Sequence, residues 1–132
     1  MSNAQKVLEF HRATGSAMPT APSLPDAATL HLRLTLLREE MNEVEEAAAK
    51  LGSLSHPSPA DLLALAHELV DLLYVSYGAL LSLGIDPDAA FAEVHRANMD
   101  KTGGPKRADG KQLKPQGWKA ADLAAALGLT NV

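Results

Sequence analysis

The residues of this sequence best suited to chemistry are two pairs of acids, and within each pair the acids are three positions apart. Glu40 and Glu43 form the first pair, and Glu68 and Asp71 form the second. Residues at this spacing are neighbours on a helix, so both carboxylates of a pair project from one side. When two such pairs face each other in a partly dry place, their charges repel, and a hard divalent cation relieves that repulsion. The pattern therefore predicts a metal site, and Mg²⁺ is the expected ion.

The bland alternative is that these acids lie on solvated helix faces, where such spacings are common. The second pair argues against it, because Glu68 and Asp71 stand in the apolar run HELVDLLYV at residues 67–75. An unpaired carboxylate in apolar surroundings is costly. Glu39 precedes the first pair and points about 100° away around the helix axis. We expect Glu39 either to complete the metal shell or to act as the base that takes a proton from the attacking water.

Two long predicted helices must position these acids. Residues 59–83 are apolar nearly all round, which is typical of a helix in the middle of a bundle. Residues 27–51 repeat apolar side chains at steps of three and four, which is a strong helical pattern. The loop between them at 53–58 is short, so we expect an antiparallel hairpin whose seam is flanked by both acid pairs.

Shorter helices are predicted at 5–14, 87–101 and 120–127, separated by segments rich in Pro and Gly. In the helix at 87–101, Ala90, Phe91 and Val94 are expected to face inward, with Ala97 as a further candidate. The sequence shows no strand pattern and no internal repeat. It therefore predicts an all-α protein, an antiparallel helical bundle with a single domain at 1–132. Within that domain we expect a helical core at 27–101 and a basic closing tail at 102–132.

Positive charge gathers late in the chain, where half of its 12 Lys and Arg residues lie. Lysines in this segment are suited to binding phosphate groups, and Asn98 offers a directed amide one turn before the first of them. The alternative is a soluble basic tail without a partner. Tyr74 is suited to stacking on a base, although a Tyr in a Leu-rich helix is more often a core residue. The candidate substrate contacts are Asn98, Lys101, Lys106, Lys111, Lys114 and Tyr74.

The bulk composition limits the classes of function. The chain has 132 residues and a net charge of −4, so it has no electrostatic reason to bind a nucleic acid polymer or an anionic membrane. It contains no Cys, which excludes disulfides and thiolate metal sites and suits a cytoplasmic protein. No run of 18 apolar residues lacks a charge, and no basic-then-apolar leader opens the chain. We therefore expect no membrane segment and no signal peptide.

Several motifs together resemble a known family. The pattern EExxE at Glu39, Glu40 and Glu43, followed by ExxD at Glu68 and Asp71, resembles the metal motif of the MazG-like all-α nucleoside triphosphate pyrophosphohydrolases. The segments EVHRANMDK at 93–101 and DGKQLKPQGW at 109–118 are similar to the small members of that group. The resemblance covers roughly residues 30–118, most of the chain.

The resemblance implies hydrolysis of a (d)NTP between the α and β phosphates, with Mg²⁺ or Mn²⁺ as cofactor. It also implies a homodimer whose helices complete the bundle and the active sites. Carried over to this chain, Glu40, Glu43, Glu68 and Asp71 are the expected metal ligands. Glu43 and Glu39 are the expected catalytic acids, Glu39 as a further ligand or general base, and Asn98 and Lys101 contact the nucleotide. The short chain and its ending most resemble the dUTP-directed branch, which clears unwanted nucleotides.

Two other functions remain open. The first is a phosphoribosyl-ATP pyrophosphohydrolase, which has a related fold and cleaves the same bond; a panel of triphosphates separates it from a dUTP-directed enzyme. The second is a helical dimer that binds a nucleotide or a partner without turning it over. For that protein, thermal stability is expected to ignore Mg²⁺, whereas crowded acids are stabilised by it.

Overall fold

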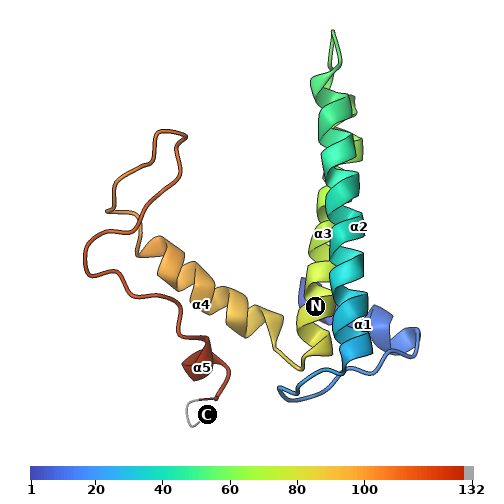
Figure 1. Ribbon diagram of the computed structural model, residues 1–132, viewed down its shortest axis with the longest axis vertical. Coiled ribbons are helices and arrows are strands. Elements are labelled where there is room, and N and C mark those ends of the chain that lie inside the picture. The colour runs from blue at the N-terminus through green and yellow to red at the C-terminus, as the bar shows by residue number, and fades with distance from the viewer. Residues whose placement is uncertain (130–132) are drawn as a thin grey trace. The chain divides into compact units, whose positions relative to one another are not determined.

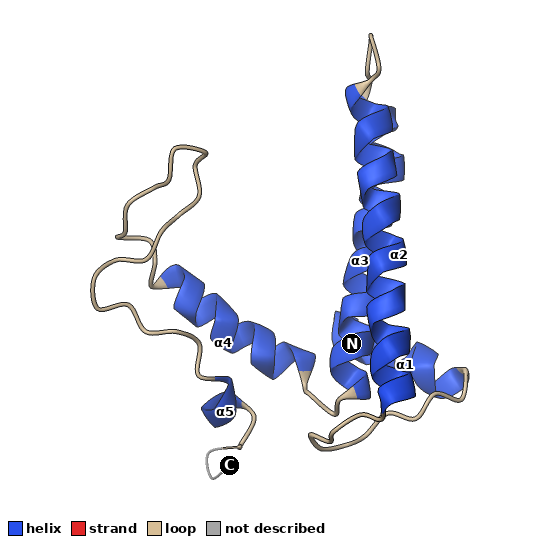
Figure 2. Ribbon diagram, in the orientation of Figure 1, coloured by secondary structure: helices blue, strands red, loops and turns tan. Residues whose placement is uncertain are grey.

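The computed structural model describes residues 1–129, and these residues are helical apart from turns and loops (Figures 1 and 2). Within this range the only strand-like feature is an isolated bridge between Lys106 and Gln112. The all-α class predicted from the sequence is therefore confirmed. The elements are α1 (Asn3–Ala13), α2 (Ala27–Gly52), the 3-10 helix η1 (Pro59–Asp61), α3 (Leu62–Ser82), α4 (Pro87–Met99) and α5 (Leu123–Ala126).

The chain divides into two compact units, one from Met1 to Ile85 and one from Asp86 onward. Each unit is described by itself below. The predicted single domain, with its core at 27–101 and tail at 102–132, stays a prediction. Residues 130–132 of that tail lie outside the described residues.

The first unit is a long antiparallel hairpin of α2 and α3, with α1 packed against α3 (Figure 1). The helix α2 begins where the side chain of Asp26 accepts a hydrogen bond from the Thr29 backbone N–H at 2.7 Å. After α3, Gly84 adopts a φ of 69°, the left-handed conformation that ends helices and that glycine adopts without strain. The hairpin predicted from the short connecting loop is thus confirmed.

Local capping explains where the helix ends differ from prediction. The first helix starts at Asn3 rather than at residue 5, because Ser2 and Gln5 form a reciprocal capping box. The predicted helix at 59–83 opens with the separate 3-10 turn η1, in which Asp61 accepts a hydrogen bond from the Ser58 backbone N–H. Ser58 stands at the N-cap of this turn and Pro59 occupies its first turn, a position that proline favours.

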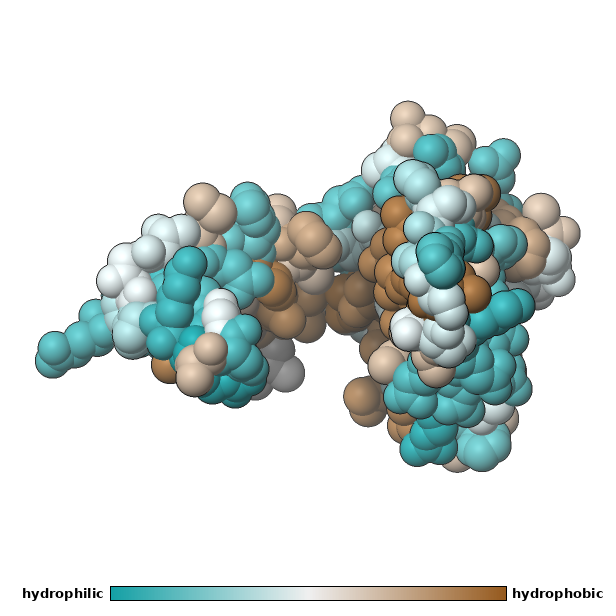
Figure 3. All heavy atoms as spheres, turned by 90° about the horizontal axis from the view of Figure 1, so that it is seen from above, coloured by the Kyte–Doolittle hydropathy of each residue, from teal (hydrophilic) through white to brown (hydrophobic). Residues whose placement is uncertain are grey.

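The expectation that α3 is enclosed in the middle of a bundle is not met within the first unit. Leu63, Val70 and Leu73 are 69%, 57% and 56% exposed, because α2 and α1 cover only part of the helix. Hydrophobic residues, brown in Figure 3, consequently reach the surface of this unit. By length and composition alone, the segment Pro59–Ser82 is also apolar enough to cross a membrane. Within the first unit, this side of α3 is therefore left without a cover.

The second unit is built on α4. Asp86 caps this helix by accepting hydrogen bonds from the backbone N–H groups of residues 88 and 89, and Pro87 occupies its first turn. Ala90 and Ala97 are buried as predicted, but Phe91 and Val94 are 67% and 40% exposed, so the prediction that they face inward is wrong. Within the second unit, the short helix α5 and the loop around Trp118 cover one side of α4, and Trp118 is tied to the Ala97 side of the helix.

Two helices of this unit are shorter than predicted. The helix α4 ends at Met99, two residues early. The last helix spans Leu123–Ala126 instead of 120–127, because the side chain of Asp122 caps it by accepting a hydrogen bond from the Ala125 backbone N–H at 3.0 Å. The backbone N–H of Asp122 in turn donates to Glu93 at 2.9 Å, which ties α5 to α4.

Candidate metal centre

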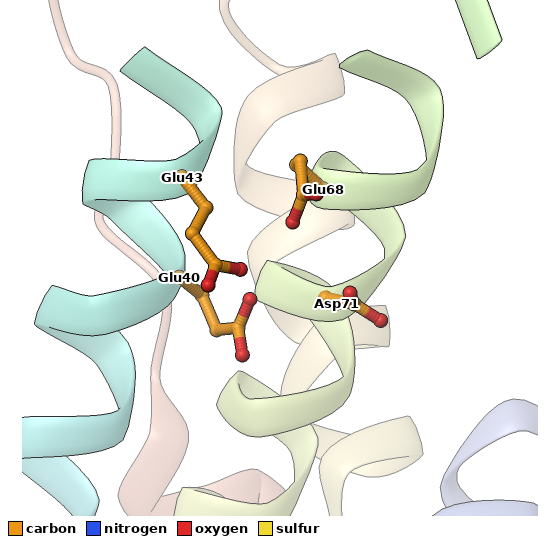
Figure 4. Close-up of side chains that lie close together, drawn as sticks. All are labelled: Glu40, Glu43, Glu68 and Asp71. Atoms are coloured by element: carbon orange, nitrogen blue, oxygen red, sulfur yellow. The ribbon is translucent and has the colours of Figure 1, made fainter. Parts of the chain in front are cut away.

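The four predicted metal ligands come together across the seam of the hairpin. Glu40 and Glu43 extend from α2 toward α3, which carries Glu68 and Asp71 (Figure 4). Each residue offers one carboxylate oxygen, and these four oxygens all lie within 4.8 Å of one another. The sequence prediction that both acid pairs flank a shared seam is therefore confirmed in its geometry. The four residues are called the acid quartet below.

The fold produces this convergence through the register of two antiparallel helices. Each acid pair covers one turn of its helix, and the turn between α2 and α3 is short, so the two turns that carry the pairs lie opposite each other. Val44, next to Glu43, is buried and helps to hold α2 in place. A shift of either helix by one residue would turn its pair away from the seam by about 100°.

Electrostatic crowding is visible at two of the four carboxylates. One oxygen of Glu40 and one of Glu68 are buried, and neither has a hydrogen-bond partner among residues 1–129. Burial and the nearby carboxylates of Glu43, Asp71 and Glu68 raise the pKa of Glu40. The adjacent carboxylate of Glu43, burial and the charge of Asp71 raise the pKa of Glu68, although nearby His67 opposes the shift.

These features fit a hard divalent cation. The donor set consists of carboxylate oxygens alone, which is what Mg²⁺, Mn²⁺ and Ca²⁺ prefer and what soft metals do not. A cation also supplies the partner that the buried oxygens of Glu40 and Glu68 lack. In addition, it favours the ionised forms that crowding disfavours, because an opposite charge nearby lowers the pKa of a carboxyl group. The quartet can therefore hold a metal ion; which ion it holds is a matter for the proposal below.

His67 supports one member of the quartet. Its Nε2 lies 3.1 Å from Oδ2 of Asp71, one turn further along α3. His67 therefore bonds locally, within its own helix. This contact orients the Asp71 carboxylate, as hydrogen-bonded neighbours of metal ligands commonly do.

Glu39 stands apart from the quartet. Its side chain is exposed, and it is not among the four residues whose oxygens converge. Its role as a further ligand or as a base stays a prediction. Glu43 is likewise exposed, but one of its oxygens does belong to the cluster.

Tyr74 lies on α3, one turn beyond Asp71 along the same helix. Its ring meets the edge of the Phe10 ring with centroids 5.7 Å apart, and Phe10 meets the ring of His11 in the same way at 5.4 Å. Phe10 is 51% exposed. Tyr74 therefore packs against α1, and its role as a substrate contact stays a prediction.

The remaining predicted substrate contacts belong to the second unit. Lys101 donates a hydrogen bond from Nζ to the side-chain oxygen of Asn98 at 2.9 Å. The ammonium groups of Lys101 and Lys114 lie 5.1 Å and 4.7 Å from the centroid of the Trp118 ring, at cation–π distance. Trp118 is fixed because its Nε1 donates to the Ala97 carbonyl at 2.7 Å. Trp118 therefore anchors this loop to α4.

Lys106 and Lys111 are exposed on the loop that follows α4. One side chain holds that loop: Gln112 donates from Nε2 to the carbonyls of Lys101 at 2.8 Å and Gly104 at 2.7 Å. Gly104 must lack a side chain, because a Cβ there would lie 2.2 Å from the Leu113 carbonyl oxygen. The lysine roles stay predictions, and the loop that carries Lys106 and Lys111 is an ordered one.

Sequence reasoning did not identify a second polar cluster in the first unit, formed by His11 of α1 and Arg33 of α2. Arg33 Nη1 donates to His11 Nε2 at 3.1 Å, beside Gly78 of α3. The available signal was Arg33 itself, which stands seven residues before Glu40 and therefore on the same helical row.

The fold and the quartet define an all-α protein with an acidic seam that can hold a metal ion. Comparison with family models extends this description, because residues 7–98 match the model of the phosphoribosyl-ATP pyrophosphohydrolase family. The match covers more than two thirds of the 132 residues, so the chain belongs to that family, a member of the all-α MazG-like superfamily. The resemblance to pyrophosphohydrolases is thereby confirmed at this level, and a hydrolase of this general class is supported. No curated protein matches the chain in a sequence search.

Proposed function

We propose that this protein hydrolyses a nucleoside triphosphate between its α and β phosphates and releases a nucleoside monophosphate and pyrophosphate. The observation that carries the proposal is the convergence of four carboxylates within 4.8 Å in a chain of a pyrophosphohydrolase family. Acids at helical spacing whose side chains do not converge form no such site. The metal ion proposed for this reaction also supplies a partner for the unpartnered buried oxygens of the quartet.

Mg²⁺ is the proposed metal, held by Glu40, Glu43, Glu68 and Asp71, with Mn²⁺ as a substitute. When bound, such an ion lowers the pKa of a water and offsets the charge that develops on the phosphoryl group. In the reaction, a water oxygen bonds to the α phosphorus, and the bond from that phosphorus to the bridging oxygen breaks. Pyrophosphate leaves with that oxygen, and a proton of the water passes to a base, for which Glu39 is the proposed group.

Two substrates are proposed for this chemistry. dUTP follows from the resemblance of the short chain and its ending to the dUTP-directed branch, which would make the protein a cytoplasmic enzyme that removes unwanted nucleotides. Phosphoribosyl-ATP is the second candidate, and the family match favours it. In both substrates the bond to be cleaved lies between the α and β phosphates, so the acid quartet can serve either one.

We also propose that the protein is a homodimer. Leu63, Val70 and Leu73 expose a continuous apolar side of α3, and single chains rarely leave such a side open to water. A second copy offers the same side in return, as two-fold interfaces require. The carboxylates of Glu68 and Asp71 interrupt this helix and argue against a lipid environment as the cover.

The test is pyrophosphate release over a panel of canonical and modified (d)NTPs and phosphoribosyl-ATP, with and without Mg²⁺. The variants Glu40→Gln and Asp71→Asn are expected to lose activity by at least a hundredfold while they keep their helical content. Glu45→Gln is the matched control, because Glu45 is exposed on the same helix as Glu40 and lies outside the quartet. Full activity in either quartet variant rules out the proposed centre. Stability that ignores Mg²⁺, with no turnover of any substrate, supports the non-catalytic dimer instead.

A further inference from the structure

A guanidinium without a countercharge lies in the seam of the hairpin. Arg33 of α2 is half-buried, and it forms no ion pair with any residue in the described range 1–129. Its Nε is fully buried and has no hydrogen-bond partner in that range. Burial lowers the pKa of Arg33, but a guanidinium stays protonated in proteins. The charge is therefore present and is not matched by an anion of the described chain.

The one polar contact of Arg33 does not neutralise it. His11 is buried, and its Nδ1 lies 2.8 Å from the Val7 carbonyl oxygen. A carbonyl only accepts, so Nδ1 carries the proton and the lone pair of Nε2 is the acceptor for Arg33 Nη1 at 3.1 Å. His11 is consequently neutral in this arrangement. It fixes the direction of the guanidinium and leaves its positive charge uncompensated.

The position of this cluster relates it to the acid quartet. Arg33 precedes Glu40 by seven residues on α2, and Gly78 follows Asp71 by seven residues on α3. Seven residues are nearly two helical turns, so both sets of residues lie along one side of the seam, about 10.5 Å apart along the axis. Tyr74 of α3 stands between them. The seam thus carries an acidic end suited to cations and a cationic end suited to anions.

We propose that Arg33, held by His11, is a phosphate-binding subsite for the substrate whose cleaved bond lies at the acid quartet. The orientation of the substrate in this inference rests on the proposed function. The binding of phosphate by Arg33 does not. The Nη2 group of Arg33 forms no hydrogen bond within residues 1–129 and, unlike Nε, is not a fully buried atom, so its N–H groups are free to donate to phosphate oxygens. The phosphate has two sources in the candidate substrates. One is the far end of the departing pyrophosphate, and the other is the separate phosphate of a phosphoribosyl group.

The competing explanation is that Arg33 only clasps α1 to the hairpin through His11. A clasp needs one hydrogen bond and no charge, whereas a partly buried charge without a partner is costly. The two explanations differ in an observable way, because a clasp does not respond to phosphate and a subsite does.

The first experiment measures thermal unfolding of the full chain against inorganic phosphate, in the presence of EDTA and at matched ionic strength. Phosphate is expected to stabilise the wild type, and Arg33→Met is expected to weaken the apparent affinity about tenfold or more, since it removes a charged hydrogen-bonding group. Arg38→Met is the matched control, because Arg38 is exposed on the same helix. The control is expected to respond as the wild type does. An equal response in Arg33→Met, or no response in the wild type, overturns the inference.

If Arg33→Met does not fold, Arg33→Lys takes its place, because it keeps the charge and removes the paired N–H groups. Wild-type affinity for phosphate in that variant overturns the inference as well. The double variant Glu40→Gln/Glu68→Gln is expected to keep the phosphate response without hydrolysing any triphosphate. Phosphate binding without turnover in the wild type therefore refutes the proposed function and leaves the subsite intact.

Kinetics separate the two sources of the phosphate. A raised KM of Arg33→Met or Arg33→Lys for both dUTP and phosphoribosyl-ATP assigns the subsite to the departing pyrophosphate. A raised KM for phosphoribosyl-ATP alone assigns it to the phosphoribosyl phosphate. An unchanged KM for every substrate that is turned over contradicts a role in substrate binding.

Discussion

Replacing Gly78 with Ala probes the packing that holds α1 and Arg33 to the hairpin. A Cβ at this position would lie 3.0 Å from the Cε1 and Nε2 atoms of His11 and 3.2 Å from Arg33 Nη1. The His11 ring cannot yield easily, because it is buried and is held on both sides by hydrogen bonds. Overpacking of this kind costs about 1–3 kcal/mol. Ala gains about 1 kcal/mol over Gly in a helix.

The expected net loss is about 1–2 kcal/mol, because the displaced ring also weakens its bond to Arg33. One kcal/mol corresponds to about 4–8 °C in Tm for a domain of 60–100 residues. The assay is thermal unfolding by far-UV circular dichroism at one protein concentration, since dimerisation makes Tm depend on concentration. Gly52→Ala is the control: Gly52 ends α2, nothing lies within 4 Å of its added Cβ, and no loss is expected. A Gly78→Ala protein as stable as the wild type would refute the tight packing inferred for the His11–Arg33 cluster.

Three further predictions follow from the quartet, the open apolar side and the loop. The raised pKa values of Glu40 and Glu68 mean that the metal-free folded state holds protons that the unfolded state releases; stability should therefore fall as pH rises from the ordinary value of 4.5 through the raised values. Urea unfolding at several pH values in EDTA measures this slope, which should vanish in the Glu40→Gln/Glu68→Gln variant. Mg²⁺ at a hundred times its Kd should raise the free energy of unfolding of the wild type by about 2.7 kcal/mol at neutral pH. Leu73→Glu places a charge on the open side of α3 and should convert dimers to monomers in sedimentation; an unchanged mass would locate the interface elsewhere. Gln112→Ala frees the carbonyls of residues 101 and 104 and should speed hydrogen exchange of the Leu113 amide about tenfold, while unchanged protection would show that the loop is held by other contacts.

Much of the hairpin could be predicted because its signals are local. The step of three and four along residues 27–51 and the apolar run at 59–83 specify helices, and Asp26, Ser58 and Gly84 mark their ends. A short loop then leaves only the antiparallel arrangement. The errors lie at helix ends whose position is set by side-chain hydrogen bonds. The capping box at Ser2, for example, starts α1 earlier than predicted.

The enclosure of α3 and the inward direction of Phe91 could not be predicted correctly for one chain. Hydrophobicity indicates that burying a side chain is favourable, but it does not indicate which element buries it. Within the first unit, α2 and α1 cover part of α3, and within the second unit, α5 and Trp118 cover one side of α4. The apolar residues on the other sides therefore remain exposed.

The acid quartet could be predicted because helical spacing fixes the side of the helix from which each carboxylate projects. Two such pairs that flank the seam of an antiparallel hairpin are expected to lie close together. The cluster of His11 and Arg33 could not, because it joins residues 22 positions apart through contacts that have no periodic signature. Gly78 did not indicate the cluster either. A glycine inside a helix ordinarily lowers helix stability, and its packing role becomes clear only from the neighbouring side chains in the structure.

The most direct test of the central claim is calorimetric titration of Mg²⁺ into the wild type, Glu68→Gln and Glu45→Gln, with pyrophosphate release measured on the same samples. If the four carboxylates form one metal centre that the reaction requires, Glu68→Gln loses Mg²⁺ binding and pyrophosphate release together. Glu45→Gln keeps both. Wild-type Mg²⁺ affinity and turnover in Glu68→Gln would contradict the claim.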